Sequence, residues 1–296
     1  MILVTGGTGF VGTHLVHALR AEDRPVRVLV RNPRSKAART AASWGCELAE
    51  GDMTDAESLD RAVAGCEAVL HLVAIPTGSG EKFERIMVQG TRDLVAASKR
   101  AGVTRFLHMS ALGTGPRSKD LTHYFRAKWE QEQTVAESGL EHVIFRPSFI
   151  FGRDGGMLPL LIRQVRWSPA VAVVGTRRMQ PIWVDDVASC FAKALSTPAA
   201  TNRTFELGGP DVLTWDELYE RIKRILGKRR RTFHPPMRLV RAGAAVVEKL
   251  PTGLPLSPDA LTMLEFDDNV TDITPAVEVF GIEPIGVNDQ IRRAAV

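Results

Sequence analysis

The sequence predicts an α/β protein of the Rossmann type, with a doubly wound parallel sheet and a smaller C-terminal α/β region. Three observations support this. Short apolar runs alternate with helical segments through the first half of the chain, the first run leads into a glycine-rich loop, and the alternation stops near Arg146. Strands that alternate with helices form parallel sheets, because parallel neighbours need a right-handed crossover.

Each element of the first half follows from a local pattern. Apolar and β-branched runs, such as Val-Arg-Val-Leu-Val, predict strands, and apolar residues at helical spacing predict helices. The expected strands cover residues 2–5, 26–30, 47–49, 68–73, 105–109 and 142–145. The expected helices cover residues 10–21, 35–44, 59–64, 84–101 and 124–137.

The pattern changes after Arg146-Pro147, where glycine and proline become frequent. Strands are expected at 171–174, 182–184 and 204–207, and helices at 185–196, 214–226 and 237–250. We therefore predict two domains. Residues 1–152 form the Rossmann-type domain, to which strands from about 180–207 return, and residues 153–296 form a smaller region for substrate or partner.

Composition excludes several classes of protein. The 296 residues are 44% hydrophobic and 24% charged, which is enough for a full core without disulfides. A net charge of +4 allows an anionic ligand but does not indicate nucleic acid as a partner. The cysteines at 46, 66 and 190 and the histidines at 108, 123 and 142 lack metal-ligand spacing, so we expect no metal site and treat these histidines as structural.

The N-terminal sequence does not resemble a targeting signal. It lacks a basic leader and runs directly into glycines, and no uncharged apolar run reaches the roughly 18 residues of a membrane-spanning helix. We therefore expect a cytoplasmic protein in a reducing compartment.

The loop TGGTGFVG between the first strand and the first helix predicts a phosphate site. Gly6 permits a tight turn, Gly9 lets the backbone approach a pyrophosphate, and Gly12 permits close packing of helix on strand. The helix start at Phe10 and Val11 offers free N–H groups and the positive end of the helix dipole. The alternative is a plain glycine-rich turn.

The end of the second strand indicates which dinucleotide binds. A protein that prefers NAD usually carries an acidic residue there, which bonds the ribose hydroxyls. This chain has Arg31, followed by Arg34 and Lys36, and a guanidinium suits the 2′-phosphate of NADP. We predict NADP(H) in preference to NAD(H); the alternative is a solvated basic loop.

Tyr124 and Lys128 stand four residues apart and share one helix face. A free tyrosine has a pKa near 10, and a nearby ammonium favours the phenolate and should lower that pKa. The pair therefore makes Tyr124 a candidate general acid or base beside a nicotinamide.

These motifs occur together in the order typical of one family. The glycine loop, Gly51-Asp52-Met53, His71-Leu72-Val73-Ala74, YFRAK and RPSFIFG resemble the extended or atypical short-chain dehydrogenase/reductases, also described as NAD-dependent epimerase/dehydratase-like proteins. Three tail segments, at 206–210, 251–258 and 280–282, resemble the branch that contains the NADPH-binding accessory subunit of respiratory complex I.

The resemblance implies a role for each matching residue. The loop glycines hold the pyrophosphate, Asp52 and Met53 flank the adenine, and Lys128 bonds the nicotinamide ribose. Four further residues are implied to line the cofactor or to lie near the nicotinamide: Val73, Ala74, Pro147 and Ser148.

Two positions depart from the family pattern. The catalytic Ser or Thr of the family follows the fifth strand, where this chain has Ser110 in one register and Ala111 in the other. The long helix carries Met87 at the place of a frequent Asn. The Tyr–Lys pair is therefore present, while the groups that support it differ.

These departures leave more than one function open. We predict an NADP-dependent oxidoreductase or epimerase/dehydratase-type enzyme acting on a small molecule, with Tyr124 transferring the proton and Ser110 orienting a carbonyl. One alternative is a non-catalytic NADPH-binding structural or sensing protein. Another is a sugar-nucleotide modifier, although the C-terminal region resembles a different branch.

Residues 223–241 contain a basic run followed by an amphipathic segment. Such a patch could touch an anionic membrane surface or a partner complex. The alternative is a solvated face beside a core-packed helix.

Overall fold

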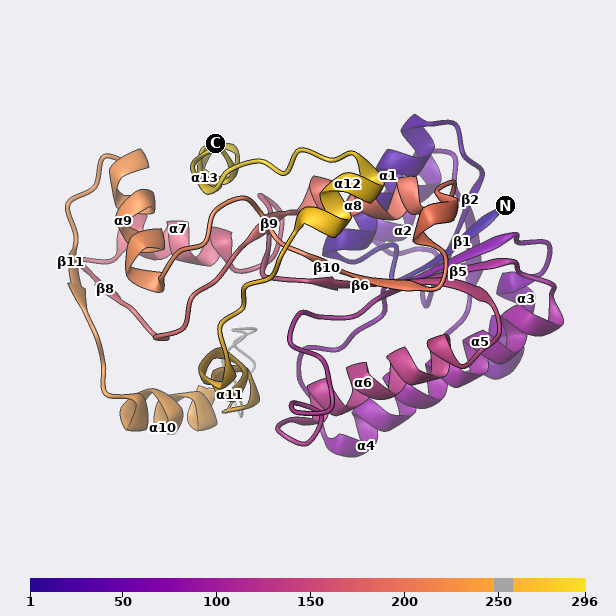
Figure 1. The fold of residues 1–296 in the computed structure, drawn as a ribbon, viewed down its shortest axis with the longest axis horizontal. Coiled ribbons are helices and arrows are strands. Elements are labelled where there is room, and N and C mark those ends of the chain that lie inside the picture. The colour runs from indigo at the N-terminus through magenta and orange to yellow at the C-terminus, as the bar shows by residue number, and fades with distance from the viewer. Residues whose placement is uncertain (248–257) are drawn as a thin grey trace. The chain divides into compact units, whose positions relative to one another are not determined.

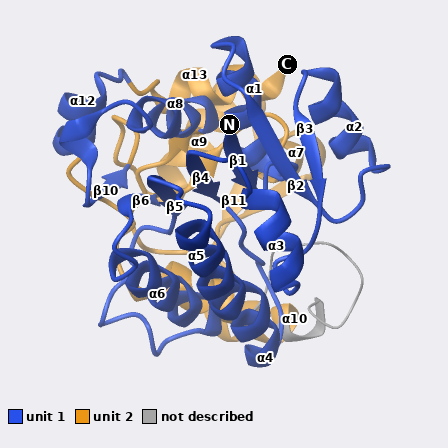
Figure 2. Ribbon diagram, turned by 90° about the vertical axis from the view of Figure 1, so that its right-hand side faces the viewer, with its two compact units in different colours: residues 1–147, 184–207, 274–283 blue, residues 148–183, 208–273, 284–296 orange. Residues whose placement is uncertain are grey.

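The computed structural model describes residues 1–247 and 258–296 (Figure 1). The chain divides into two compact units (Figure 2). Unit 1 contains residues 1–147, 184–207 and 274–283, and unit 2 contains residues 148–183, 208–273 and 284–296. The chain therefore leaves unit 1 after its sixth strand and returns to it twice.

Unit 1 is built on a seven-stranded sheet in which every neighbouring pair is parallel. Its strands are β1 (Ile2–Thr5), β2 (Val26–Val30), β3 (Glu47–Glu50), β4 (Ala68–His71), β5 (Arg105–Met109), β6 (Glu141–Pro147) and β10 (Arg203–Leu207). The spatial order is β10-β6-β5-β4-β1-β2-β3, which confirms the predicted Rossmann-type fold. The order reverses between β1 and β4, and ligands of such sheets bind at the carboxyl ends of the strands beside that point.

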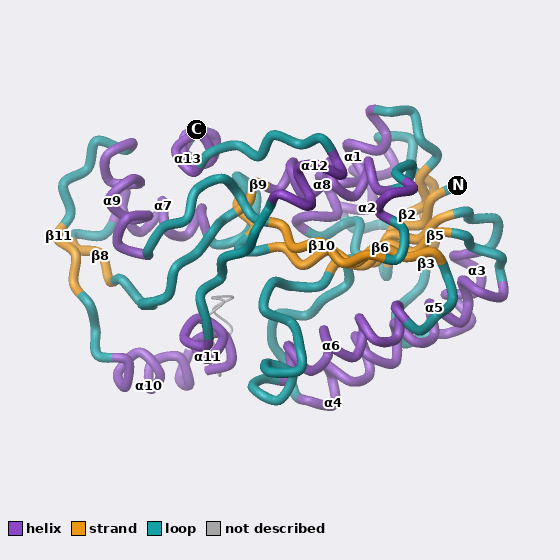
Figure 3. Tube along the Cα trace, viewed as in Figure 1, coloured by secondary structure: helices purple, strands orange, loops and turns teal. Residues whose placement is uncertain are grey.

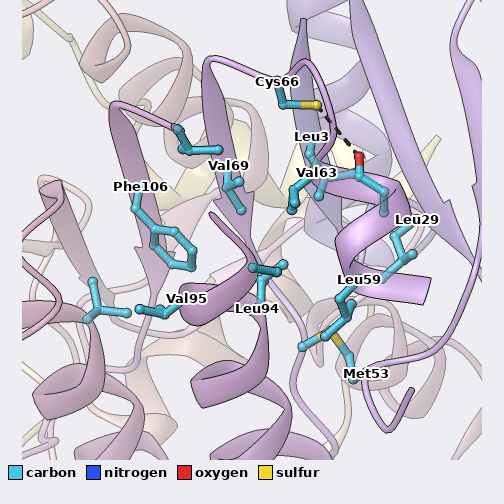
Figure 4. Packing of buried hydrophobic residues seen from close by; sticks show 14 of the residues in the cluster. Leu3, Leu29, Met53, Leu59, Val63, Cys66, Val69, Leu94, Val95 and Phe106 are labelled. Atoms are coloured by element: carbon cyan, nitrogen blue, oxygen red, sulfur yellow. Dashed lines mark hydrogen bonds between the residues drawn. The ribbon is translucent and has the colours of Figure 1, made fainter. Parts of the chain in front are cut away.

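Helices cover both faces of this sheet (Figure 1). One face carries α1 (Phe10–Ala21), α8 (Val184–Ala194) and α12 (Thr274–Phe280), with α2 (Lys36–Ser43) beside α1. The other face carries α3 (Ala56–Val63), α5 (Gly90–Arg100) and α6 (His123–Ala136). Under α3 and α5 lies a continuous apolar cluster that includes Leu3, Leu59, Leu94 and Phe106 (Figure 4).

The long helix predicted at 84–101 is interrupted, which corrects the sequence-based expectation. It begins as α4 (Gly80–Phe83), widens into the π-helix η1 (Glu84–Gln89) and continues as α5. A Cβ on Gly90 would lie 2.7 Å from the Met53 carbonyl oxygen, so the helix passes close to the chain after β3 at this point. Apolar spacing does not reveal one extra residue in a turn, so the sequence could not predict the π-helix.

Other boundaries differ by a few residues. β4 ends at His71 rather than at residue 73, α8 begins at Val184, and β8 covers Ala170–Ala172. The helix predicted at 237–250 is α10 (Met237–Val247). Residues 248–250 of that prediction, and 251–257 of the tail segment, lie outside the described residues.

In its described residues, unit 2 consists mostly of helices and loops, with two short parallel strand pairs (Figure 3). The pairs are β7 (Ile150–Phe151) with β9 (Ile182–Trp183), and β8 with β11 (Arg231–Phe233). The further helices are α7 (Leu158–Trp167), α9 (Trp215–Ile225), α11 (Pro258–Phe266) and α13 (Val287–Ala295), and α7, α9 and α13 pack together. Among the described residues, no helix is both long and apolar enough to cross a membrane.

A capping box fixes the start of α9. The Thr214 hydroxyl accepts a hydrogen bond from the Glu217 backbone N–H, and the Glu217 carboxylate accepts one from the Thr214 backbone N–H. Two N–H groups at the helix start are thereby satisfied.

The buried cluster gives a stability prediction. Leu94 is fully buried between α5 and the sheet, so Leu94→Ala should lower the free energy of unfolding by about 2–5 kcal/mol, because it leaves a cavity as well as losing apolar burial. Urea denaturation measures this loss. Leu121→Ala, which makes the same change at a side chain 39% exposed, should cost much less. Equal losses would contradict the assignment of Leu94 to the core.

Candidate cofactor and catalytic site

The glycine loop after β1 has the geometry of an anion cradle. Gly6 has φ of +76°, which favours glycine, and a Cβ on Gly12 would lie 2.1 Å from the Gly6 carbonyl oxygen. Gly9 is the N-cap of α1 and supplies no side-chain cap, and the first turn contains no acidic residue. The N–H groups at Phe10, Val11 and Gly12 therefore have no acceptor in their own helix, and the loop fits a dinucleotide pyrophosphate.

The loop lies against the end of β4. A Cβ on Gly6 would lie 3.1 Å from the Leu72 carbonyl carbon and 3.2 Å from the Val73 nitrogen. Val73 is half-buried and Ala74 is exposed. The fold therefore brings the ends of β1 and β4 together at the reversal of strand order.

The ends of β2 and β3 bring charged residues together. Asp52 is half-buried and its carboxylate accepts two hydrogen bonds from Thr54, at 2.8 Å from the backbone nitrogen and 2.7 Å from the hydroxyl. Partial burial opposes ionisation, but these bonds and the guanidinium groups of Arg31 and Arg85 outweigh it and lower the pKa of Asp52. Arg31 is exposed and makes no side-chain hydrogen bond to the described residues. Sequence reasoning missed Arg85, because it lies on a helix far along the chain.

Met53 follows Asp52 and is buried. Its side chain packs into the cluster with Leu29 and Leu59 (Figure 4). Val73 packs against the same cluster. Met53 therefore connects the adenine end of the predicted site to the core.

Helix α6 positions the Tyr–Lys pair. Thr122 caps the helix by accepting a hydrogen bond from the Phe125 backbone N–H at 3.1 Å. Lys128 is 1% exposed, and its Nζ donates to the Met109 carbonyl oxygen at 2.7 Å. The same Nζ lies 6.0 Å from the centroid of the Tyr124 ring. The half-buried Tyr124 packs edge-on against Phe83, and its hydroxyl has no hydrogen-bond partner among the described residues.

The pKa of Tyr124 differs from the value expected from the sequence, where a nearby ammonium was expected to lower it. Exclusion of water by the surrounding protein instead raises the pKa of Tyr124 to about 12, although part of the ring stays exposed. Burial also lowers the pKa of Lys128 to about 7, against the opposing effect of Glu132. The expected depression of the Tyr124 pKa was wrong for this structure, because loss of hydration disfavours the charged phenolate and raises the pKa.

Ser110 follows β5 directly and is buried. Its backbone N–H donates to the Phe145 carbonyl oxygen at 2.7 Å, and its hydroxyl lies 3.4 Å from the Thr114 hydroxyl. Ala111 is half-buried. No hydrogen bond joins Ser110 to Tyr124 in the part of the chain that the structure describes. Thr114 is not among the residues predicted from the sequence, where its four-residue spacing from Ser110 was the available signal.

Pro147 and Ser148 fall in different units. Pro147 ends β6, and its carbonyl oxygen accepts a hydrogen bond from the Leu112 backbone N–H at 2.9 Å. Ser148 begins unit 2, where its hydroxyl bonds to the Asn269 side chain.

A buried polar network lies at the carboxyl ends of β1, β4 and β5. His71 Nδ1 lies 2.7 Å from the Thr5 hydroxyl, and His71 Nε2 lies 2.9 Å from the Thr91 hydroxyl. The Gln131 amide donates to the Thr91 hydroxyl at 2.8 Å and to the Met87 carbonyl oxygen at 3.2 Å. An amide from α6 therefore reaches the neighbourhood where the family often has Asn.

His108 stacks on His71 with ring centroids 5.3 Å apart, and neither of its ring nitrogens has a hydrogen-bond partner in the described chain. Burial lowers the pKa of His71 to about 3 and holds the pKa of His108 well below its usual range, and Lys128 adds to both effects. Both imidazoles are therefore neutral at pH 7.

The fold and these motifs define a nucleotide-binding oxidoreductase of the short-chain dehydrogenase/reductase type. The chain belongs to the NAD dependent epimerase/dehydratase family, whose model matches residues 2–208.

Relatives extend this similarity beyond the matched segment. The chain is 30% identical to the mitochondrial NADH dehydrogenase [ubiquinone] 1 alpha subcomplex subunit 9 of Mus musculus, over 95% of this chain and 76% of that protein. It is 29% identical to ceramide reductase of Caulobacter vibrioides, over 83% and 77% of the two chains. The structure of an NADPH-dependent quinone oxidoreductase from Escherichia coli superposes with a TM-score of 0.80 at 20% identity and covers 99% of each chain, which supports the fold.

Burial of Lys128 predicts a pH dependence of stability. The pKa of Lys128 falls from 10.5 to about 7 on folding, so the unfolded state binds more protons between these values. Stability without cofactor should therefore rise with pH from about 7 to 10, with a slope approaching about 1.4 kcal/mol per pH unit from this one group.

Lys128→Met isolates this contribution, because it removes the titrating amine and keeps an apolar stem. Urea denaturation at several pH values should give a stability difference between variant and wild type that narrows as pH rises through this window. Parallel curves would contradict the burial of a desolvated amine.

Proposed function

We propose that the protein is an NADPH-dependent reductase of a small-molecule carbonyl, in which Tyr124 donates a proton and Lys128 holds the nicotinamide ribose. The observation that carries this proposal is the placement of a buried lysine one helical turn after a tyrosine whose hydroxyl has no hydrogen-bond partner among the described residues. Burying an amine lowers the stability of the ligand-free protein. A buried amine at this position therefore favours a role in binding a ligand.

Bound NADPH would supply the hydride, and the chain supplies its binding site and the proton. The N–H groups after Gly9 would bind the pyrophosphate. Arg31, exposed and free of side-chain hydrogen bonds to the described residues, would bind the 2′-phosphate, with Arg85 close to the same carboxylate of Asp52. Two guanidinium groups around one acid favour a dianionic phosphate over an uncharged ribose hydroxyl.

The protonation state of Tyr124 favours reduction. A phenol with a pKa of about 12 keeps its proton throughout the neutral range, so it can donate that proton to a carbonyl oxygen as negative charge develops there. The ammonium form of Lys128, lying near the ring, would then stabilise the phenolate left behind. Ser110 would orient the carbonyl, since within the described part of the chain its hydroxyl makes only the 3.4 Å contact with Thr114.

Relatives support a reductase. Ceramide reductase of Caulobacter vibrioides is 29% identical over 83% of this chain. Its name indicates reduction in a relative that shares most of the chain, and we extend that class of reaction to this protein.

A second candidate function is non-catalytic NADPH binding. Met87 is fully buried and apolar at the place where the family often has Asn, and the mouse respiratory subunit matches over 95% of the chain. Under this alternative the dinucleotide would stabilise the fold, and the Tyr–Lys pair would catalyse no reaction.

Arg31 gives a test of cofactor preference. Arg31→Ala should weaken NADPH binding by about tenfold or more and leave NADH binding nearly unchanged, because it removes a charge-assisted bond to the phosphate. Fluorescence titration with each dinucleotide measures both constants. Arg61→Ala, at an exposed arginine of α3, is the control and should change neither. Equal losses of affinity for NADPH and NADH would contradict the predicted preference for NADP(H).

Tyr124 gives a test of catalysis, and the chain provides a matched control in its only other tyrosine. Tyr124→Phe should lower turnover by about 10²–10⁴-fold, the typical contribution of a general acid, while NADPH affinity barely changes. Tyr219→Phe removes a hydroxyl that donates to Gln164 at 2.6 Å and should leave turnover intact. Loss of turnover in both variants would point to general instability, and unchanged turnover in the first would remove Tyr124 from the mechanism.

A further inference from the structure

A basic groove of about 560 Å³ opens on the surface of unit 2, and the reductase proposal does not use it. Six cations and one carboxylate line it: Lys223, Arg224, Lys228, Arg229, Arg230, Arg231 and Glu220. They come from the last turns of α9, the turn that follows it and the first residue of β11.

Two of these cations are fixed by the fold. Lys223 is 8% exposed, and its Nζ lies 2.5 Å from the Glu220 carboxylate and 2.8 Å from the Thr232 hydroxyl. The Arg230 guanidinium donates to the carbonyl oxygens of Val165 and Arg166, each at 3.1 Å. The carboxylate in the described lining is therefore already paired, and internal bonds hold two of the six cations in place.

The other four cations are exposed: Arg224, Lys228, Arg229 and Arg231. None of the four makes a side-chain hydrogen bond or ion pair with the residues that the structure describes. Some exposed arginines elsewhere do pair, as Arg100 does with Asp60 and Arg126 with Asp120. What sets the groove apart is that four such cations lie together. The C-terminal end of α9 carries only about half a negative charge, which does not balance four cations. The uncompensated positive charge of these four side chains favours binding of an anionic partner.

Exposed aromatic side chains adjoin the groove. Trp167, at the end of α7, is 76% exposed, and Phe233, at the end of β11, is 49% exposed. Both are held beside the cations, since Arg230 bonds the carbonyl of the residue before Trp167, and Arg231 pairs in register with Ala170. Large exposed aromatics cost solubility and are not needed to bind a soluble phosphate, whereas tryptophan favours the interface between lipid and water.

We propose that this basic groove and its rim of Trp167 and Phe233 form a docking surface for a bilayer that contains anionic phospholipids. The cations attract the lipid phosphates and the two aromatic rings enter the interface, as in other proteins that lie on a membrane without crossing it. This inference is independent of the reductase proposal, because it rests on different residues.

The test uses the full chain and sedimentation with vesicles of phosphatidylcholine, alone or mixed in equal parts with phosphatidylglycerol. Binding should require phosphatidylglycerol and should weaken as salt rises, because ions screen the cations. Lys228→Gln with Arg229→Gln should reduce the affinity by about 25-fold, since each surface cation contributes about 1 kcal/mol, or roughly fivefold. Arg61→Gln with Lys99→Gln removes two exposed cations from unit 1 and should have no comparable effect.

Trp167 provides the second arm. Trp167→Ser should weaken vesicle binding and Trp167→Phe should retain most of it, with thermal melting of both variants as a check on folding. Equal binding to both vesicle types, or equal losses in the two double variants, would overturn the proposal. Inorganic diphosphate that binds with the same dependence on Lys228 and Arg229, without any vesicle binding, would assign the groove to a soluble phosphate and would also overturn it.

Discussion

The hydrogen bond from Lys128 Nζ to the Met109 carbonyl oxygen joins α6 to the carboxyl end of β5, and the arrangement of the candidate site depends on it. It holds an amine almost completely out of water and fixes the helix face on which Tyr124 stands one turn earlier. The desolvation that lowers the pKa of Lys128 also makes further positive charge nearby costly. The two stacked imidazoles of His71 and His108 are neutral at pH 7, because burial and the nearby Lys128 lower their pKa values.

The cost of further positive charge near Lys128 also explains why the polar network beside the site consists of neutral groups. Thr5, His71, Thr91 and Gln131 exchange hydrogen bonds with one another, so the ends of β1 and β4 and two helices are tied by neutral groups. Gln131 brings an amide to the carbonyl of Met87. The place of the usual Asn is therefore not an apolar gap, because the Gln131 amide nitrogen reaches it, although Gln131 Oε1 has no hydrogen-bond partner in the described chain. This arrangement is compatible with either an active reductase or a stable dinucleotide-binding protein.

The structural features that the sequence predicted correctly are those set by local spacing. A glycine loop between strand and helix, and a strand order that follows from crossovers, need only neighbouring residues, and the structure has both. The Thr5–His71 and His71–His108 contacts arise from register across parallel strands, which joins residues far apart in the chain. The pKa of Tyr124 was mispredicted for the same reason, because the spacing to Lys128 shows a charge but not the water that folding removes. Tertiary packing likewise determines the π-helix, the position of Arg85 near Asp52 and the hydrogen bonds of Arg230. Local sequence patterns therefore did not predict them.

The central claim is that the chain uses Tyr124 and Lys128 to reduce a carbonyl with hydride from NADPH. The most direct measurement is to incubate the protein with NADPH deuterated at the transferred position and a panel of aldehydes, ketones and quinones, and to analyse the products by mass spectrometry. The account predicts an alcohol or hydroquinone product formed at the expense of NADPH, with one deuterium on the carbinol carbon of any alcohol. NADPH that binds and stabilises the protein but is never oxidised, with no deuterium in any product, would contradict it.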